Sequence, residues 1–131
     1  MPASEQQDQK RSLAGTRVLL IEDEYFTADE VRRILSDAGA EVATVATVAK
    51  ANAALDGATF DCVMLDLNLS GENAIAIGDR MAKEGRTFAI ATGYGSPAIP
   101  ERLKHVPRLE KPFDPIVVLR LVEQLVRAPA E

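Results

Sequence analysis

Cysteine and histidine are scarce in this 131-residue chain, which contains one of each. A single cysteine cannot form an internal disulfide, so nothing in the sequence indicates an oxidising compartment. Cys62 lies inside an apolar run and is interpreted as a small buried residue. His105 is interpreted as an ordinary surface residue. The fold therefore has to rest on an apolar core, for which one domain of this length suffices.

An excess of positive charge is also missing. The 15 basic and 20 acidic residues give a net charge of −5, which disfavours nucleic acid as a partner because phosphate backbones attract basic surfaces. No apolar run approaches the roughly 20 residues that span a membrane, and the polar N-terminus has no apolar signal core. The sequence predicts a soluble cytoplasmic protein without a nucleic-acid or membrane partner.

Short apolar runs alternate along the chain with segments of helical spacing. The expected strands are 17–22, 40–46, 60–67, 87–92 and 108–111. The expected helices are 24–39, 47–57, 72–85 and 114–128. Between the last two strands, prolines at 97, 100 and 107 leave room for only one or two helical turns. Residues 1–15 are expected to form a disordered tail, 16–128 the domain, and 129–131 a short C-terminal tail.

Strands that alternate with helices predict an α/β fold with a parallel sheet and helices on both faces. Because crossovers are right-handed, few topologies remain. The flavodoxin-like strand order 2-1-3-4-5 is the expected one. The fourth helix of this fold, which connects strands 4 and 5, is expected to be shortened or irregular. Ligands of such folds bind beyond the carboxyl ends of the strands, near the switch point between strands 1 and 3.

Polar residues of distinct kinds stand at four of the five predicted strand ends. Glu22 and Asp23 stand at the end of the first strand, Asp66 at the end of the third, Thr92 at the end of the fourth and Lys111 at the end of the fifth. These four strands are neighbours in the expected order, so we expect the five side chains to converge on one pocket. The second strand is peripheral and ends without such a group.

The chemistry of this pocket follows from its charges. Carboxylates only a few ångströms apart repel one another and stay ionised only beside a cation. Oxygen ligands without histidine or a second cysteine indicate Mg²⁺. A lysine and a hydroxyl beside the metal suit a phosphoryl group, and Asp66 is then a candidate nucleophile. Thr92 is expected to face that phosphoryl group, and Gly93 lets the backbone come close to it.

The segments "VLLIEDE", "DCVMLDLNLSGE", "AIATG" and "LEKPF" resemble the receiver domain of two-component response regulators. The resemblance covers about residues 16–128. It implies that Asp66 is the phosphoacceptor and, with Lys111, a catalytic residue, and that Thr92 and Lys111 bind the phosphoryl group and trigger a rearrangement. It further implies that Mg²⁺ is bound by the acid pair, by Asp66 and by the backbone carbonyl of Asn68.

The resemblance also implies a signalling switch or phosphate relay. Such a domain takes its phosphoryl group from a sensor histidine kinase or a histidine phosphotransferase. It phosphorylates itself from the donor and dephosphorylates itself, and is otherwise not an enzyme. Since the chain ends soon after the last helix, we expect no output domain and an action through contact with a downstream signalling protein.

Three departures from common receivers narrow the resemblance. Ser70 and Gly71 stand where a proline is usual, and Arg108 stands where a switch aromatic is usual. An aromatic, Tyr94, instead follows Thr92 in "IATGY", which resembles the motif of the FAT GUY subfamily apart from its first residue. That subfamily is typical of alphaproteobacteria and of HWE and HisKA2 kinases. We expect Tyr94 to replace the switch aromatic and the 93–107 segment to be the mobile output element.

Two alternatives remain open at this point. An aspartyl-nucleophile phosphatase of the haloacid dehalogenase type shares the parallel sheet and Mg²⁺, but it needs a second aspartate where this chain has Asn68, and its nucleophile lies on the first strand. A pseudo-receiver that docks without phosphorylation is the other alternative, and the complete set of acids, hydroxyl and lysine argues against it. Tyr94 also has an alternative interpretation, as an ordinary loop aromatic.

Overall fold

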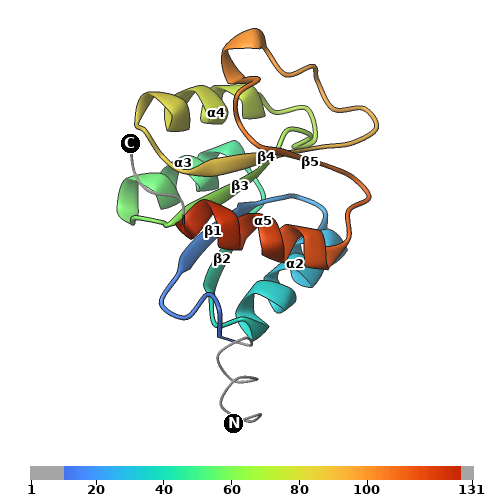
Figure 1. Cartoon of the computed structure of the whole chain (residues 1–131). Coiled ribbons are helices and arrows are strands. Elements are labelled where there is room, and N and C mark those ends of the chain that lie inside the picture. Colours follow the sequence, from blue (N-terminus) through green and yellow to red (C-terminus); the bar gives the residue numbers. More distant parts are fainter. Residues whose placement is uncertain (1–10, 128–131) are drawn as a thin grey trace, which may run out of the picture.

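A computed structural model describes residues 11–127 as a five-stranded parallel sheet covered by helices on both faces (Figure 1). The strands are β1 Arg17–Ile21, β2 Glu41–Val45, β3 Cys62–Asp66, β4 Phe88–Thr92 and β5 Arg108–Glu110. The helices are α2 Tyr25–Asp37, α3 Val48–Gly57, α4 Ala74–Lys83 and α5 Pro115–Arg127, with a single 3₁₀ turn, η1, at Glu101–Leu103. The strand order β2-β1-β3-β4-β5 confirms the predicted flavodoxin-like topology.

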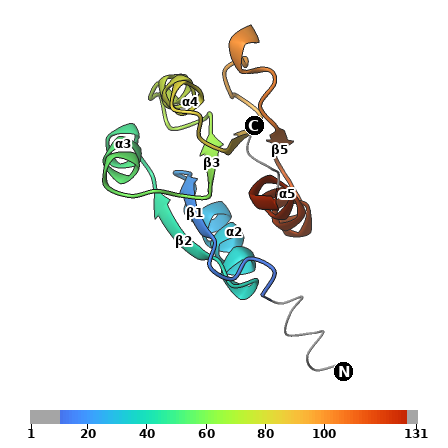
Figure 2. The same ribbon diagram turned by 60° about the vertical axis from the view of Figure 1, so that its left-hand side comes forward.

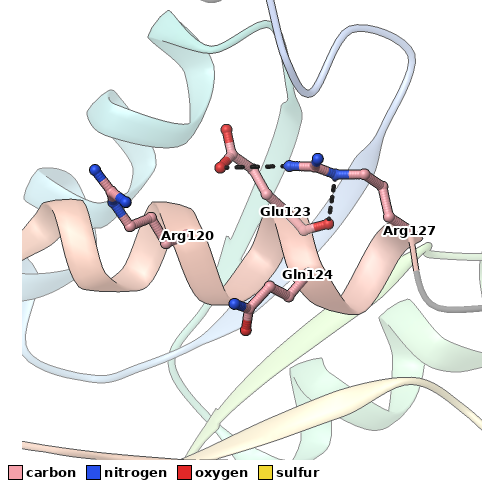
Figure 3. A pocket seen from close by; sticks show the side chains of 4 residues that line it. All are labelled: Arg120, Glu123, Gln124 and Arg127. Atoms are coloured by element: carbon pink, nitrogen blue, oxygen red, sulfur yellow. Dashed lines mark hydrogen bonds and ion pairs between the residues drawn. The ribbon is translucent and has the colours of Figure 1, made fainter.

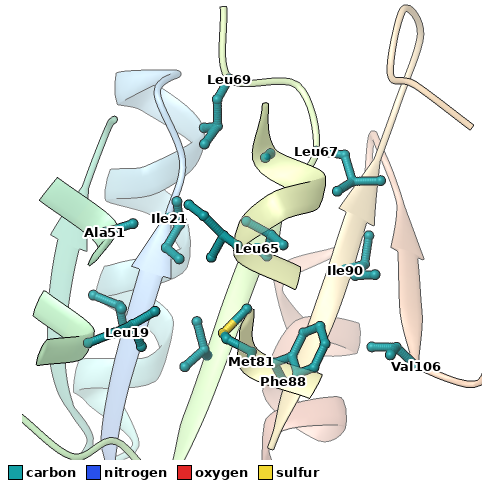
Figure 4. Close-up of a cluster of buried hydrophobic side chains, with 14 of the residues drawn as sticks. Leu19, Ile21, Ala51, Leu65, Leu67, Leu69, Met81, Phe88, Ile90 and Val106 are labelled. Carbon is teal, nitrogen blue, oxygen red and sulfur yellow. The ribbon is translucent and has the colours of Figure 1, made fainter. Parts of the chain in front are cut away.

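Alternate residues of each strand point to opposite faces of the sheet, and each face has its own apolar cluster. Leu19 and Ile21 of β1 face α3 and α4, whereas Val18 and Leu20 face α2 and α5. Figure 2 shows these two helix pairs on opposite sides of the sheet. The first cluster, drawn in Figure 4, also holds Leu65 of the central strand. Because both faces are covered, the inner strands β1, β3 and β4 are nearly continuous apolar runs, whereas the edge strands β2 and β5 are partly exposed.

The segment between β4 and β5 contains no helix longer than η1. This confirms the sequence prediction that the helix between the last two strands, the fourth helix of the fold, is shortened. Leu103 and Val106 are buried in the cluster on the α4 side and anchor the end of the segment to the sheet. Its beginning is exposed at Tyr94, Gly95 and Pro97.

The predicted tail at 1–15 is wrong for residues 11–15. Leu13 is fully buried in the cluster beneath α2 and α5, and its N–H donates to the carbonyl of Ala38 (2.8 Å). Ala14 packs so closely on Gly39 that a Cβ there would lie 2.9 Å from the Ala14 nitrogen. Gly39 has a φ of +102°, which glycine adopts readily after a helix. The remaining tail predictions, 1–10 and 129–131, lie outside the described residues.

Cys62 is fully buried and burial raises the pKa of its thiol to about 12, so it serves as a core residue, as predicted. His105 is exposed, also as predicted. Within residues 11–127, none of the helices has the length and apolar character required to cross a bilayer.

Candidate functional site

The carboxyl ends of β1, β3, β4 and β5 meet at one edge of the sheet, and the polar residues predicted there lie at this edge. Ile21 pairs with Leu65 in the sheet. Glu22 and Asp66, which directly follow these two residues, are therefore neighbours. Asp66 in turn pairs with Ala91, the residue before Thr92. Thr92 pairs with Glu110, the residue before Lys111. The register of the sheet alone therefore gathers residues that are far apart in sequence.

Three carboxylates form a cluster at this edge. Glu22, Asp23 and Asp66 each offer one oxygen, and these oxygens lie within 4.8 Å of one another. Glu22 is 5% exposed and Asp66 is 3% exposed, whereas Asp23 is partly open to solvent. The next acid along the chain, Glu24, does not join them, because its side chain caps α2 by accepting from the N–H groups of Phe26 and Thr27.

Lys111 lies between the two buried acids. Its Nζ contacts Glu22 Oε1 at 2.7 Å and Asp66 Oδ2 at 3.0 Å. Two backbone N–H groups add to this arrangement, Glu24 N–H to Glu22 Oε2 (3.1 Å) and Asn68 N–H to Asp66 Oδ1 (3.0 Å). Both buried carboxylates are thus hydrogen-bonded at both oxygens, which a buried charge requires.

Burial and the neighbouring charges both shift the pKa values of this site. Burial, together with Asp66, raises the pKa of Glu22 to about 7, although Lys111 and Glu24 N–H oppose the rise. Burial lowers the pKa of Lys111, but its bonds to Glu22 and Asp66 outweigh this and leave the pKa raised. Three ionised carboxylates and one ammonium would leave an excess of negative charge that a divalent cation could balance.

The residues present fit Mg²⁺. All the side-chain donors are carboxylate oxygens, which Mg²⁺ prefers, and the partly exposed Asp23 leaves room for the waters that Mg²⁺ keeps. Asn68 follows Asp66 closely enough for its N–H to bond that carboxylate, so its peptide lies beside the cluster. Its backbone carbonyl stays a predicted ligand.

Thr92 is half-buried at the end of β4, and its carbonyl accepts from Lys111 N–H (2.7 Å). A Cβ at Gly93 would lie 3.2 Å from Lys111 Cβ, so a larger residue here would require the lysine side chain to shift. A turn follows, in which Gly93 N–H donates to Ser96 Oγ (2.9 Å). The chain thus brings the hydroxyl of Thr92 and the ammonium of Lys111 to the same edge as Asp66.

Tyr94 is fully exposed, so it does not cap the core. It lines an open pocket of about 330 Å³ together with Thr27, Glu30, Lys111, Pro112 and Phe113. Lys111 therefore borders both the acid cluster and the pocket that Tyr94 lines. Arg108, at the position where a switch aromatic is usual, is exposed as well.

One residue of this edge was missed as a functional candidate. The hydroxyl of Ser70, in the loop after β3, donates to Asp23 Oδ2. Its only signal in the sequence was indirect, the absence of the usual proline at this position. A second hollow, of about 410 Å³, lies along α5 and is lined by Arg120, Glu123, Gln124 and Arg127 (Figure 3). None of the strand-end residues lines it.

The family model for the response regulator receiver domain matches residues 18–122. The chain is 30% identical over 115 residues to the transcriptional regulatory protein FixJ of Bradyrhizobium diazoefficiens, covering 84% of this chain and 56% of FixJ. It is 35% identical over 72 residues to the transcriptional regulatory protein TcrA of Mycobacterium tuberculosis, covering 55% of this chain and 28% of TcrA. The chain thus spans about half the length of one curated relative and less of the other.

Solved structures agree with these relatives. The solution structure of SdrG from Sphingomonas melonis Fr1 matches with a TM-score of 0.72 and 30% identity, covering 85% of this chain and 96% of SdrG. The chain belongs to the family of response regulator receiver domains. Receiver domains are signalling domains of two-component systems rather than general enzymes, they interact with histidine kinases or phosphotransferases, and they typically bind Mg²⁺ at an acidic cluster such as the one found here.

Proposed function

We propose that Asp66 accepts a phosphoryl group from the phosphohistidine of a sensor histidine kinase or a histidine phosphotransferase. The observation that carries this proposal is the placement of Asp66: its carboxylate is buried, contacts Lys111 and lies within 4.8 Å of two further carboxylates. A buried strand-end carboxylate that is held by a lysine, in a family that uses this position for phosphorylation, has few other uses.

In the proposed transfer, one carboxylate oxygen of Asp66 forms a bond to phosphorus while the bond from phosphorus to the donor nitrogen breaks. The electron pair of the broken bond goes to the imidazole, and Asp66 becomes a mixed anhydride. Lys111 is placed to leave its contact with Asp66 Oδ2 and pair with a phosphoryl oxygen. The Thr92 hydroxyl donates to another. Glu22, Asp23, Asp66 and the Asn68 carbonyl would hold Mg²⁺, which would supply charge neutralisation at the transferring group.

The conformational change on phosphorylation would pass to the surface through the turn after Thr92. Tyr94 is exposed beside the pocket that Lys111 lines, and Gly93 and Gly95 flank it. A Thr92 side chain that moves toward the phosphoryl group would pull this turn with it and shift the 93–107 segment. The sequence "IATGY" and the reduction of the fourth helix to η1 support a place in the FAT GUY subfamily, and thus a kinase of the HWE or HisKA2 type.

Incubation with a small phosphodonor and Mg²⁺, followed by intact-mass measurement, tests the proposal. A stable adduct of about 80 Da on the wild type, absent from Asp66→Asn, is expected. The absence of any adduct and of donor consumption would instead indicate a docking module without phosphorylation. Continuous donor consumption without an adduct would indicate a phosphatase.

A further inference from the structure

The loop between β3 and α4 reverses in a tight turn over residues 69–72. Glu72 N–H donates to the carbonyl of Leu69 (3.0 Å), and both central residues have positive φ, +46° at Ser70 and +83° at Gly71. Turns of this shape favour glycine, asparagine or aspartate at the central positions. Ser70 is the one non-glycine residue with positive φ among residues 11–127. Proline cannot adopt this φ, which explains its absence here.

The turn is held by its neighbours rather than by Ser70 itself. Leu69 is buried in the core cluster beneath α3 and α4. Glu72 Oε1 accepts from the N–H of Val48 (2.9 Å), at the first residue of α3. The backbone of Ser70 is therefore kept in an unfavourable conformation by contacts on both sides. A non-glycine residue kept at such a φ is a reason to ask what its side chain does.

The Ser70 hydroxyl bonds Asp23, which lies 47 residues earlier in the chain. Of the three acids in the cluster, Glu22 and Asp66 are each held by Lys111 and by a backbone N–H. Within the described part of the chain, the bond from Ser70 is the hydrogen bond that holds the side chain of Asp23. Without it, repulsion from the other two carboxylates would favour rotation of Asp23 toward solvent.

We propose that Ser70 is a positioning residue for the metal: its hydroxyl holds Asp23 in the arrangement in which the three acids bind Mg²⁺. This inference rests on the proposed function, since it concerns the same metal site. A carboxylate has two oxygens and about four lone-pair directions. One bond from Ser70 to Oδ2 therefore leaves Oδ1 free as a ligand. Hydrogen bonds that orient metal ligands in this way often govern metal affinity.

The test compares Mg²⁺ binding by the wild type, Ser70→Ala and Ser70→Gly, measured by calorimetry and by the melting shift at increasing Mg²⁺. Both variants lack the hydroxyl, but only glycine also relieves the positive φ, so Ser70→Gly keeps the test valid if Ser70→Ala folds poorly. Ser36→Ala, on the exposed surface of α2, is the matched control.

We expect the dissociation constant for Mg²⁺ to rise roughly tenfold or more in both Ser70 variants, because losing a hydrogen bond that orients a metal ligand typically weakens metal binding by about 10–100-fold. Phosphorylation from a small donor should be slowed at low Mg²⁺ and restored at saturating Mg²⁺, because Ser70 does not touch the reacting atoms. Unchanged Mg²⁺ affinity in both variants, or a change in Ser70→Ala alone, would overturn the role of the hydroxyl. A wild type that binds no Mg²⁺ would instead refute the proposed metal site.

Discussion

Replacing Lys111 with methionine tests whether one ammonium holds the buried acids together. Methionine has a similar length but cannot pair with Glu22 and Asp66, which Lys111 contacts at 2.7 and 3.0 Å. Removing one partner of a buried ion pair costs about 3–5 kcal/mol, since a charge is left buried without compensation. The Lys111 side chain is 25% exposed and Glu22 can take up a proton, so the lower end of this range applies.

We therefore expect Lys111→Met to lower the free energy of unfolding by about 3 kcal/mol at pH 8 in Mg²⁺-free buffer, or the melting temperature by roughly 10 °C. The pH dependence follows from Glu22, whose pKa rises from 4.5 to about 7 on folding. The folded protein then binds more protons than the unfolded chain between these values, so its stability falls as pH rises through that window. Without Lys111, which lowers the pKa of Glu22, the window extends to higher pH. The difference between the two proteins should accordingly grow with pH.

Chemical denaturation followed by circular dichroism, at pH 5 and pH 8 and with or without Mg²⁺, measures these differences. Mg²⁺ should stabilise Lys111→Met more than the wild type, because it replaces the missing positive charge. Lys104→Met is the control: Lys104 is exposed and, among residues 11–127, forms an ion pair with Glu101 on η1 alone (3.2 Å), so its loss should cost under about 0.5 kcal/mol. Equal stability of wild type and Lys111→Met at pH 8 would refute the idea that Lys111 neutralises the buried acids.

Three further outcomes are expected. Asp66→Asn should abolish the phosphoryl adduct in intact-mass spectra while the Mg²⁺-free melting temperature stays or rises, because one charge leaves a cluster of three acids; retained phosphorylation would contradict the assignment. For a dissociation constant on the order of 1 mM, about 10 mM Mg²⁺ should stabilise the wild type by roughly 1.4 kcal/mol, and calorimetric scans of Asp23→Ala should show a smaller shift. Tyr94→Ala should keep phosphorylation of Asp66 but weaken the gain in hydrogen-exchange protection across 93–107 on phosphorylation; a normal gain would leave Tyr94 as a loop aromatic.

The fold and the residues that make up the site can be predicted from the sequence. Apolar runs of strand length that alternate with helical spacing allow few topologies once crossovers are right-handed. In the resulting strand order, residues at the carboxyl ends of the strands lie along one edge of the sheet, so the amino-acid pattern alone predicts that Glu22, Asp66 and Lys111 gather there, as the structure shows. The ends of the strands are less well specified: β3 begins at Cys62, although the apolar run begins at Phe60. A ladder ends where pairing ends, and composition does not record this.

How that site is held depends instead on tertiary contacts. The bond from Ser70 to Asp23 requires a tight turn that brings the loop after β3 over the end of β1, and a φ that no residue pattern specified. Leu13 lies in a polar segment of the sequence, where a single leucine gives no periodic signal. In the structure it is nevertheless buried in the apolar cluster beneath α2 and α5. Which residues gather at the edge of the sheet follows from the spacing of strands and helices along the chain and from the strand order that this spacing allows. The path of a loop and the filling of a core depend on contacts between distant residues, and these exist only once the chain has folded.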